Sequence, residues 1–224
     1  TSAAIRSRMS VCCSAAVTSW LMTVTLSTLP EATAWAFTEQ IISSLPQAVA
    51  CLLDPADCGP AFIALPQDIQ EVACDYPEAF FAPTVHEIPR PRPDRKRVAQ
   101  AIALLKTAKR PLIIAGGGTR YSGAEEVVAK FALDHGIPLT ETIAGKSTVT
   151  HDNPAYAGPI GIVGSTSANA LAAEADVIVA IGTRLMDFTT GSWTVFGQDA
   201  KFISINAARW DATKHRALAV VDDA

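Results

Sequence analysis

The chain has 224 residues, of which 49% are hydrophobic and 18% are charged. Because this composition supplies a sizeable apolar core, it excludes a disordered or fibrous protein, and the length fits one large domain or one domain with an appendage. The formal net charge of −4 is too mildly acidic to indicate a nucleic-acid partner. Five cysteines without a C-x-x-C pair argue against a disulfide framework and favour a cytoplasmic location. Four scattered histidines argue against a metal site.

The first 37 residues differ in composition from the rest of the chain. They carry three charged side chains, Arg6, Arg8 and Glu31, and residues 11–29 are uncharged. A basic start, an apolar stretch and an A-x-A sequence at 32–34 have the pattern of a secretory signal, but many serines and threonines dilute the stretch. We expect residues 1–37 to be an atypical, non-native or disordered segment, and we expect no membrane partner.

Residues 38–93 predict a helix, a strand and a linker. Thr38 can cap a helix that runs to Leu53, and Pro46 should break or kink that helix because proline lacks the N–H donor. Residues 61–65 form a short apolar run typical of a strand. Five prolines between 75 and 93 indicate an extended linker. This linker separates a piece of one domain, residues 38–74, from a second domain, residues 94–224.

Helices and apolar strands alternate in the second region. Asp94 is a predicted N-cap, and the following helix places Val98, Ala101, Ile102 and Leu105 on one face. Further helices are expected after a capping box at 122–125, carrying Val127, and after Thr166 or Ser167; the expected strands are 111–115, 137–140, 176–181 and 201–205. Continuous apolar strands between helices predict an α/β fold with a Rossmann-like, doubly wound parallel sheet.

Glycine-rich loops follow several of the predicted strands. Ligands of open α/β sheets bind beyond the carboxyl ends of the strands, and glycine lets backbone N–H groups approach a phosphate. The candidate nucleotide-binding residues are Gly116, Gly117, Gly118, Gly161, Gly164, Ser165, Gly182, Arg184 and Asn206. Two alternatives stay open. The loops can be tight turns, since Tyr121 stands where G-x-G-x-x-G needs its third glycine, and Arg184 can pair with Asp187 instead of a ligand. No catalytic set is visible.

Several motifs resemble those of thiamine-diphosphate-dependent enzymes. Residues 59–68 (GPAFIALPQD) resemble the end of their pyrimidine-binding domain, and residues 110–118 and 175–184 resemble strands and turns of their central domain. Residues 65–68, 144–147, 153–161 and 187–196 are similar to motifs of the decyclising trihydroxycyclohexane-1,2-dione hydrolases of myo-inositol catabolism. The resemblance runs from about residue 39 to residue 224 and is missing from residues 1–37.

The resemblance implies a hydrolase that uses thiamine diphosphate and Mg²⁺. The thiazolium carbanion would add to a ring carbonyl, carbon–carbon cleavage would open the ring, and water would release 5-deoxyglucuronate. The family's activating glutamate and its G-D-G magnesium motif lie in flanking domains. We therefore expect this chain to hold no catalytic or metal-binding residue, to be inactive alone, and to have as partners the missing N- and C-terminal domains of the same enzyme, a homo-oligomer when complete.

Two other readings stay open. One is the central domain of an acetolactate-synthase-like carboligase, which binds FAD through loops matching the glycine-rich ones here. Asn206 stands in place of the aspartate usual in those enzymes, so that a vestigial FAD or ADP site is implied. The other is a non-catalytic interaction module.

Overall fold

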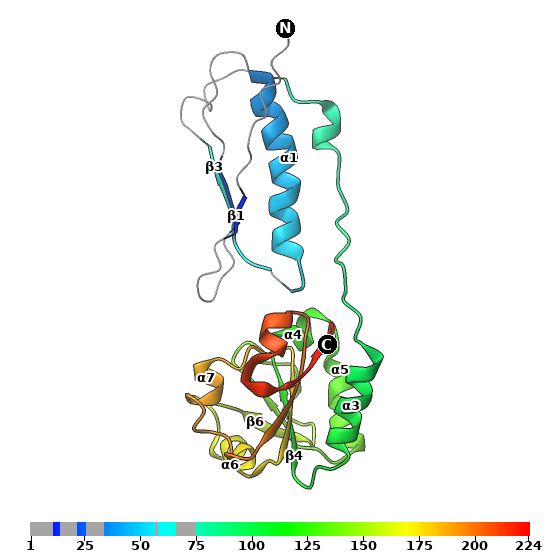
Figure 1. Cartoon of the computed structure of the whole chain (residues 1–224), viewed down its shortest axis with the longest axis vertical. Coiled ribbons are helices and arrows are strands. Elements are labelled where there is room, and N and C mark those ends of the chain that lie inside the picture. Colours follow the sequence, from blue (N-terminus) through cyan, green and yellow to red (C-terminus); the bar gives the residue numbers. More distant parts are fainter. Residues whose placement is uncertain (1–10, 14–21, 26–33, 57, 66–74) are drawn as a thin grey trace. The chain divides into compact units, whose positions relative to one another are not determined.

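The computed structural model describes residues 11–13, 22–25, 34–56, 58–65 and 75–224. The chain divides into two units, residues 1–89 and residues 90–224 (Figure 1). The division falls inside the predicted linker. No helix among the described residues has the length and apolar character needed to cross a membrane.

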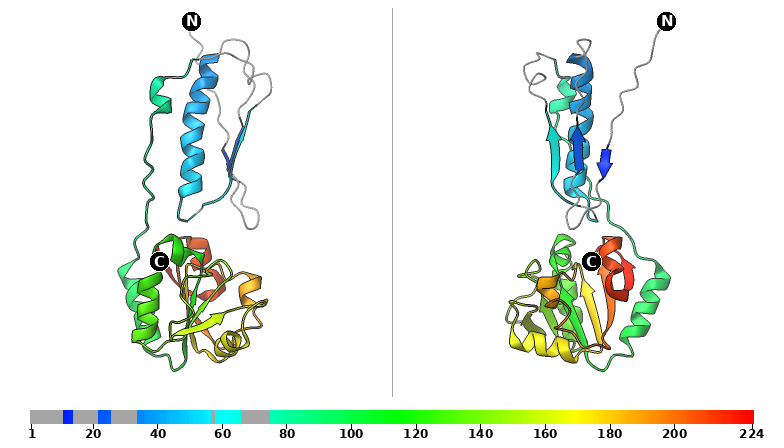
Figure 2. Two further views of the ribbon diagram at one scale, coloured as in Figure 1. Left: turned by 180° about the vertical axis from the view of Figure 1, so that it is seen from behind. Right: turned by 60° about the vertical axis from the view of Figure 1, so that its left-hand side comes forward.

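The first unit contains a three-stranded sheet and one long helix. The strands are β1 (Val11–Cys13), β2 (Met22–Thr25) and β3 (Ala61–Ala64); β2 pairs antiparallel with β1 and parallel with β3. Helix α1 (Ala34–Leu53) lies against this sheet (Figure 2). Where the structure describes residues 1–37, they form β1, β2 and the first turn of α1, and the rest of the uncharged run lies outside the described residues. That the segment is non-native stays a prediction.

Helix α1 corrects two local predictions. It begins at Ala34, so Thr38 lies inside it and is not its N-cap. It also continues through Pro46, although an interior proline costs about 3 kcal/mol. Ser44 and Ala48 are buried on either side of this proline, which shows that the helix is packed there. We attribute the continuity of α1 to this packing, which offsets the lost hydrogen bond.

Residues 75–94 contain one short helix. A short 3-10 helix, η1 (Glu78–Phe81), carries Phe80 and Phe81, whose rings contact each other and that of Tyr76 at centroid distances of 5.2–6.2 Å. Residues 83–94 form neither helix nor strand. Arg90 pairs with Asp223, which fixes the end of this stretch to the second unit.

The second unit is built on six parallel strands in the order β6-β5-β4-β7-β8-β9. Their bounds are β4 (Pro111–Ala115), β5 (Leu139–Glu141), β6 (Tyr156–Pro159), β7 (Val177–Ile181), β8 (Lys201–Asn206) and β9 (Leu218–Val221). The chain adds β5 and β6 on one side of β4, and β7, β8 and β9 on the other. The carboxyl ends of β4 and β7 therefore mark the point where the winding reverses, the usual ligand position in such sheets.

Helices cover both faces of this sheet. Helices α3 (Arg95–Leu105) and α5 (Glu125–Asp134) lie on one face, and α6 (Thr166–Glu174) and α7 (Asp187–Thr190) lie on the other (Figure 1). Two apolar cores result, one around Ile113 and Val179 and the other around Ile114 and Ile178. Short helices α4 (Gly117–Tyr121), α8 (Arg209–Ala212) and η2 (Lys214–Arg216) complete the unit. The predicted Rossmann-like α/β fold is confirmed.

The predicted N-cap of α3 is confirmed, but two predicted core positions are wrong. Asp94 caps α3 by accepting the N–H groups of Lys96 and Arg97, as predicted. Ile102 and Val127 do not face the core, since they are 49% and 71% exposed. Each lies at the edge of the narrow buried face of its helix, where smaller side chains, such as Ala101 on α3 and Val128 on α5, contact the core.

Two predicted helix caps are wrong. The N-cap of α5 is Ala124, and the Ser122 hydroxyl donates to the carbonyls of Gly118 and Thr119, because residues 117–121 form the helix α4 that needs these bonds. The cap of α6 is Ser165, whose side chain accepts the Ala168 N–H, so neither Thr166 nor Ser167 has this role.

Candidate functional site

The loops after β4 and β7 meet where the winding of the sheet reverses. The Gly116 N–H donates to the Ile181 carbonyl at 2.8 Å, and the Gly118 N–H donates to the Gly182 carbonyl at 2.9 Å. The Thr119 N–H donates to the Gly116 carbonyl at 3.1 Å. These donors, which a phosphate would need, are engaged in bonds within and between the two loops.

Glycine is required here because the two backbones touch. A Cβ atom on Gly116 would lie 2.4 Å from the Gly182 oxygen, and one on Gly118 would lie 2.6 Å from the Gly182 Cα. Gly182 itself has φ +58°, and its Cβ would lie 2.5 Å from the Thr119 nitrogen. Gly117 is less crowded, with the Ala144 oxygen at 3.1 Å. The glycines thus serve a close contact between loops, and nucleotide binding by them stays a prediction.

The loop after β6 is closed in a similar way. Gly161 has φ +107°, and a Cβ there would lie 2.1 Å from the Phe188 oxygen, in the turn that contains α7. The Asn169 side chain of α6 binds both backbone polar groups of Gly161. It accepts the Gly161 N–H at 3.0 Å and donates to the Gly161 carbonyl at 2.9 Å. Gly164 donates its N–H to the Gly161 carbonyl, and Ser165 caps α6. The polar groups of this loop order the loop itself.

Arg184 and Asn206 also have partners inside the chain. The Arg184 Nε lies 3.4 Å from Oδ2 of Asp211 on α8, so the ion pair that forms is not the one considered with Asp187. The Asn206 amide donates to the Thr183 carbonyl at 3.0 Å, and its oxygen accepts the Ala208 N–H at 2.9 Å. The structure therefore brings Gly116, Gly118, Gly182, Arg184 and Asn206 to one sheet edge, where they connect neighbouring loops.

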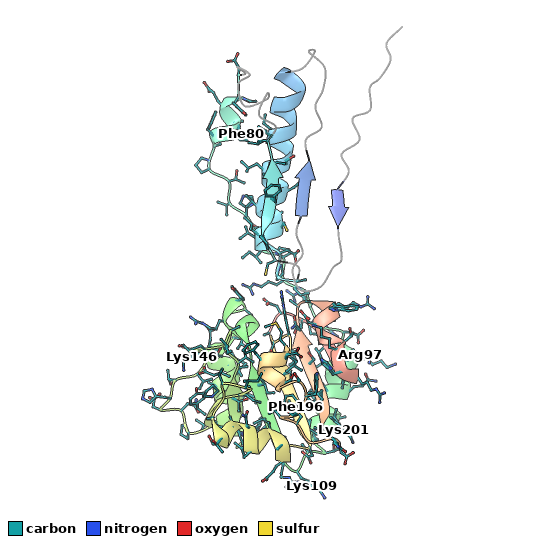
Figure 3. The ribbon with its side chains drawn as sticks, turned by 90° about the vertical axis from the view of Figure 1, so that its left-hand side faces the viewer. Phe80, Arg97, Lys109, Lys146, Phe196 and Lys201 are labelled. Carbon is teal, nitrogen blue, oxygen red and sulfur yellow. The ribbon has the colours of Figure 1, made fainter. Side chains whose placement is uncertain are left out.

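A buried carboxylate at the same edge was not singled out from the sequence. Glu141 ends β5 with 1% of its side chain exposed. It accepts hydrogen bonds from Lys146 Nζ at 3.0 Å, the Ser147 N–H at 2.9 Å and the Tyr156 hydroxyl at 2.6 Å. Lys146 reaches it from the exposed surface (Figure 3). An acidic residue directly after a predicted apolar strand, five positions before a lysine, was the available signal.

These contacts make the carboxylate a fixed point for its loop. Ser147 has φ +69°, a left-handed conformation that a non-glycine residue adopts only when its surroundings impose it. Its N–H is held by the Glu141 carboxylate. Burial, and then the hydrogen bond to Glu141, raise the pKa of Tyr156 to about 12. Tyr156 therefore stays a neutral donor at physiological pH, and β5, the following loop and β6 are linked through one side chain.

The described residues do not fit the Mg²⁺-diphosphate group that the sequence motifs imply. No three His, Cys, Asp or Glu side chains among residues 34–56, 58–65 and 75–224 are grouped to hold a metal ion. Two acidic side chains at the carboxyl edge, Glu141 and Asp211, are already neutralised by Lys146, and by Arg184 with Lys214. Glu141 and Asp211 are therefore engaged with cations of the chain itself.

The second unit matches a known protein family. The family model of the central domain of thiamine pyrophosphate enzymes matches residues 98–224. The chain belongs to this family. A solved structure from Mycobacterium smegmatis, described as a thiamin diphosphate-dependent enzyme, superposes with a TM-score of 0.63 at 23% identity, over 83% of this chain and 35% of that one. At that identity the likeness supports the fold alone.

Relatives of higher identity carry the name of one hydrolase. A 3D-(3,5/4)-trihydroxycyclohexane-1,2-dione hydrolase of Geobacillus thermodenitrificans is 44% identical over 186 residues. The protein of the same name from Bacillus subtilis is 45% identical over 187 residues. Each alignment covers 83% of this chain, and the chain spans 29% of the length of either relative. The similarity thus concerns less than a third of those enzymes.

Proposed function

We propose that this chain is the central domain, with the end of the preceding domain, of a thiamine-diphosphate- and Mg²⁺-dependent hydrolase that opens the ring of 3D-(3,5/4)-trihydroxycyclohexane-1,2-dione. The observation that carries the proposal is the 44–45% identity to hydrolases of that name over 186–187 residues. The similarity spans both the end of the first unit and the central domain. In this reading the enzyme acts in myo-inositol catabolism, in the cytoplasm, as a homo-oligomer.

The contribution of this chain would be structural. The loops at the carboxyl edge bind one another through Gly116, Gly118, Gly161 and Gly182, and the Glu141 carboxylate fixes the loop after β5. Such a scaffold holds flanking domains at a fixed separation, which matters because a small misplacement of reacting groups is costly in rate. The cofactor supplies the carbanion chemistry when bound, and its activating groups would come from the flanking domains.

A domain exchange tests the proposal directly. Residues 38–224 would replace the corresponding segment of the Bacillus subtilis relative, and ring opening would be assayed with thiamine diphosphate and Mg²⁺. We expect the exchanged protein to hydrolyse the dione and this chain alone to show no turnover. A matched exchange uses the central segment of the Mycobacterium smegmatis protein, which shares the fold at 23% identity with this chain and should not restore activity.

The contrary results are distinct. An exchanged protein that folds, binds thiamine diphosphate and leaves the dione intact would overturn the hydrolase assignment. Co-purification of FAD with that protein would instead support the central domain of an acetolactate-synthase-like carboligase.

A further inference from the structure

An open hollow lies at the amino edge of the sheet, opposite the glycine loops. It has a volume of about 680 Å³ and is lined by the beginnings of β8 and β9, the end of α3 and the segment 193–200. This volume is within the range of about 300–1,000 Å³ that is typical of small-molecule sites. Two of its residues, Trp193 and Phe196, belong to the motif at 187–196, but the proposed function assigns no role to this hollow, which we call the aromatic hollow.

Aromatic rings form the floor of the aromatic hollow. Trp193, Phe196 and Phe202 contact one another with ring centroids 5.2–5.5 Å apart, and His215 lies against Trp193 at 3.6 Å. Phe196 and Phe202 are buried, whereas Trp193 is half-buried and His215 is exposed. Trp193 and His215 are therefore the rings that a planar group could reach, since aromatic side chains bind such groups by stacking, and Phe196 and Phe202 support Trp193 from below.

Two unpaired cations stand on the rim. Lys201 and Arg216 line the hollow and are exposed, and neither forms an ion pair with a residue of the described part of the chain (Figure 3 shows Lys201 near Phe196). One carboxylate, Asp199, also lines the rim, which leaves a net positive charge. A guanidinium and an ammonium beside an aromatic floor suit an anionic group attached to a ring.

The backbone around the hollow adopts unfavourable conformations. Ser192, Trp193, His215 and Arg216 have φ between +51° and +69°, the left-handed region that non-glycine residues seldom occupy. Two separate segments, 192–193 and 215–216, thus use this conformation to place Trp193, His215 and Arg216 around one space. Strained backbone of this kind tends to gather at functional sites.

We propose that the aromatic hollow binds a planar organic anion, an aromatic or heteroaromatic ring that carries a phosphate or a carboxylate. The ring stacks on Trp193 beside His215, and Arg216 and Lys201 bind the anionic group. Because the hollow faces the edge opposite to the carboxyl ends of the strands, its ligand is distinct from anything bound at the glycine loops.

Titration of the whole chain with AMP and with salicylate tests the proposal, with tryptophan fluorescence and calorimetry as readouts. We expect saturable binding of at least one of them, with a fluorescence change that disappears in Trp193→Phe and persists in Trp210→Phe, which alters an exposed tryptophan outside the hollow. Arg216→Gln should weaken binding about tenfold, as expected for loss of a charge-assisted hydrogen bond. Arg209→Gln, an exposed arginine off the rim, should not weaken it.

Three results would overturn the proposal. The first is no binding of either anion at millimolar concentration by the folded chain. The second is equal affinity in Arg216→Gln, Lys201→Gln and the unaltered chain. The third is loss of AMP affinity in Arg184→Gln but not in Arg216→Gln, which would place the nucleotide at the glycine loops. Adenosine and inorganic phosphate, each carrying half of the chemistry of AMP, should both bind more weakly than AMP. None of these outcomes depends on dione hydrolysis, so this proposal and the proposed function can fail separately.

Discussion

The two edges of the central sheet differ in what occupies them. At the carboxyl edge, backbone meets backbone, with Gly116 and Gly118 packed against Gly182. At the amino edge, the aromatic hollow stays open, and its cations have no ionic partner among the described residues. At the position that the topology favours for a ligand, the two loops thus bind each other, whereas the opposite edge leaves Trp193 half-buried and Lys201 and Arg216 exposed.

The glycines of the carboxyl edge allow close approach of another backbone. A glycine after a strand permits either a close ligand or a close second loop, because both need the space of a missing Cβ. Between β4 and β7 the second loop takes that space, and the carbonyls of Ile181 and Gly182 accept the N–H groups of Gly116 and Gly118. A glycine loop at a switch point therefore indicates close approach but does not identify the approaching group.

The largest expected effect follows from filling that space. Gly182→Ala should destabilise the chain by about 3 kcal/mol, since it adds overpacking against Thr119 to an unfavourable positive φ. Urea unfolding followed by circular dichroism measures the change. Gly123→Ala is the matched control: its φ is +68°, but nothing lies within 4 Å of a Cβ there, so only the cost of backbone conformation, about 1 kcal/mol, should appear.

Equal costs for the two alanine variants would show that the loops after β4 and β7 separate easily. In that case their N–H groups would be accessible to a ligand, and the carboxyl edge would regain its place as a candidate nucleotide site.

A second effect concerns the buried carboxylate of the carboxyl edge. Glu141→Gln should lower the free energy of unfolding by about 2 kcal/mol. The carboxylate accepts hydrogen bonds from three donors, whereas the amide of a glutamine would point its N–H group toward at least one of them. Glu174→Gln is the control, since the exposed Glu174 pairs with exposed Arg110 at 3.7 Å and its loss should cost less than about 0.5 kcal/mol. Similar unfolding midpoints for both variants would contradict a fixed point at Glu141.

The pKa of the Tyr156 hydroxyl gives a second test of the Glu141 contacts. Its raised pKa, about 12 against 10, means that Tyr156 contributes stability that is fully present below pH 10 and is lost as the pH rises through about 12. Glu141→Gln removes the negative charge beside Tyr156 but leaves burial, so the pKa of Tyr156 should fall toward 10 without reaching it. Phenolate absorbance measures it, with Tyr156→Phe identifying the contribution of this residue. An unchanged titration would show that burial alone sets the pKa.

A smaller effect is expected at the end of β8. Asn206→Ala removes the bonds to Thr183 and Ala208 and should cost about 1 kcal/mol, measured as a shift of the urea midpoint. Asn206→Asp should cost at least as much, because a carboxylate oxygen would then face the Thr183 carbonyl. A stabilising Asn206→Asp change would contradict the role of the Asn206 amide as a donor to Thr183.

The fold could be predicted further than the site. The apolar runs at 111–115 and 177–181 are strands because a sheet covered on both faces needs continuous hydrophobic residues, and this signal lies within each run; Asp176, which we included in the second predicted strand, lies just before it. The partners of Arg184 and Asn206 could not be predicted, since Asp211 and Thr183 approach them only once the crossovers are formed. Trp193 and His215, 22 positions apart in the printed sequence, meet for the same reason.

The smallest expected effect lies at the amino edge. His215 is exposed overall, but partial desolvation of its imidazole, and then the charge of Lys214, lower its pKa below 6.5. Its stability contribution is therefore present above pH 6.5 and is lost as the pH falls through the lowered value. Unfolding midpoints should therefore decrease between pH 7.5 and 5, and His215→Gln should reduce that slope. His86→Gln, an exposed histidine of the extended stretch, should leave it unchanged. If His215→Gln leaves the slope intact, the imidazole is as well hydrated as in the unfolded chain, and the aromatic hollow loses one of its walls.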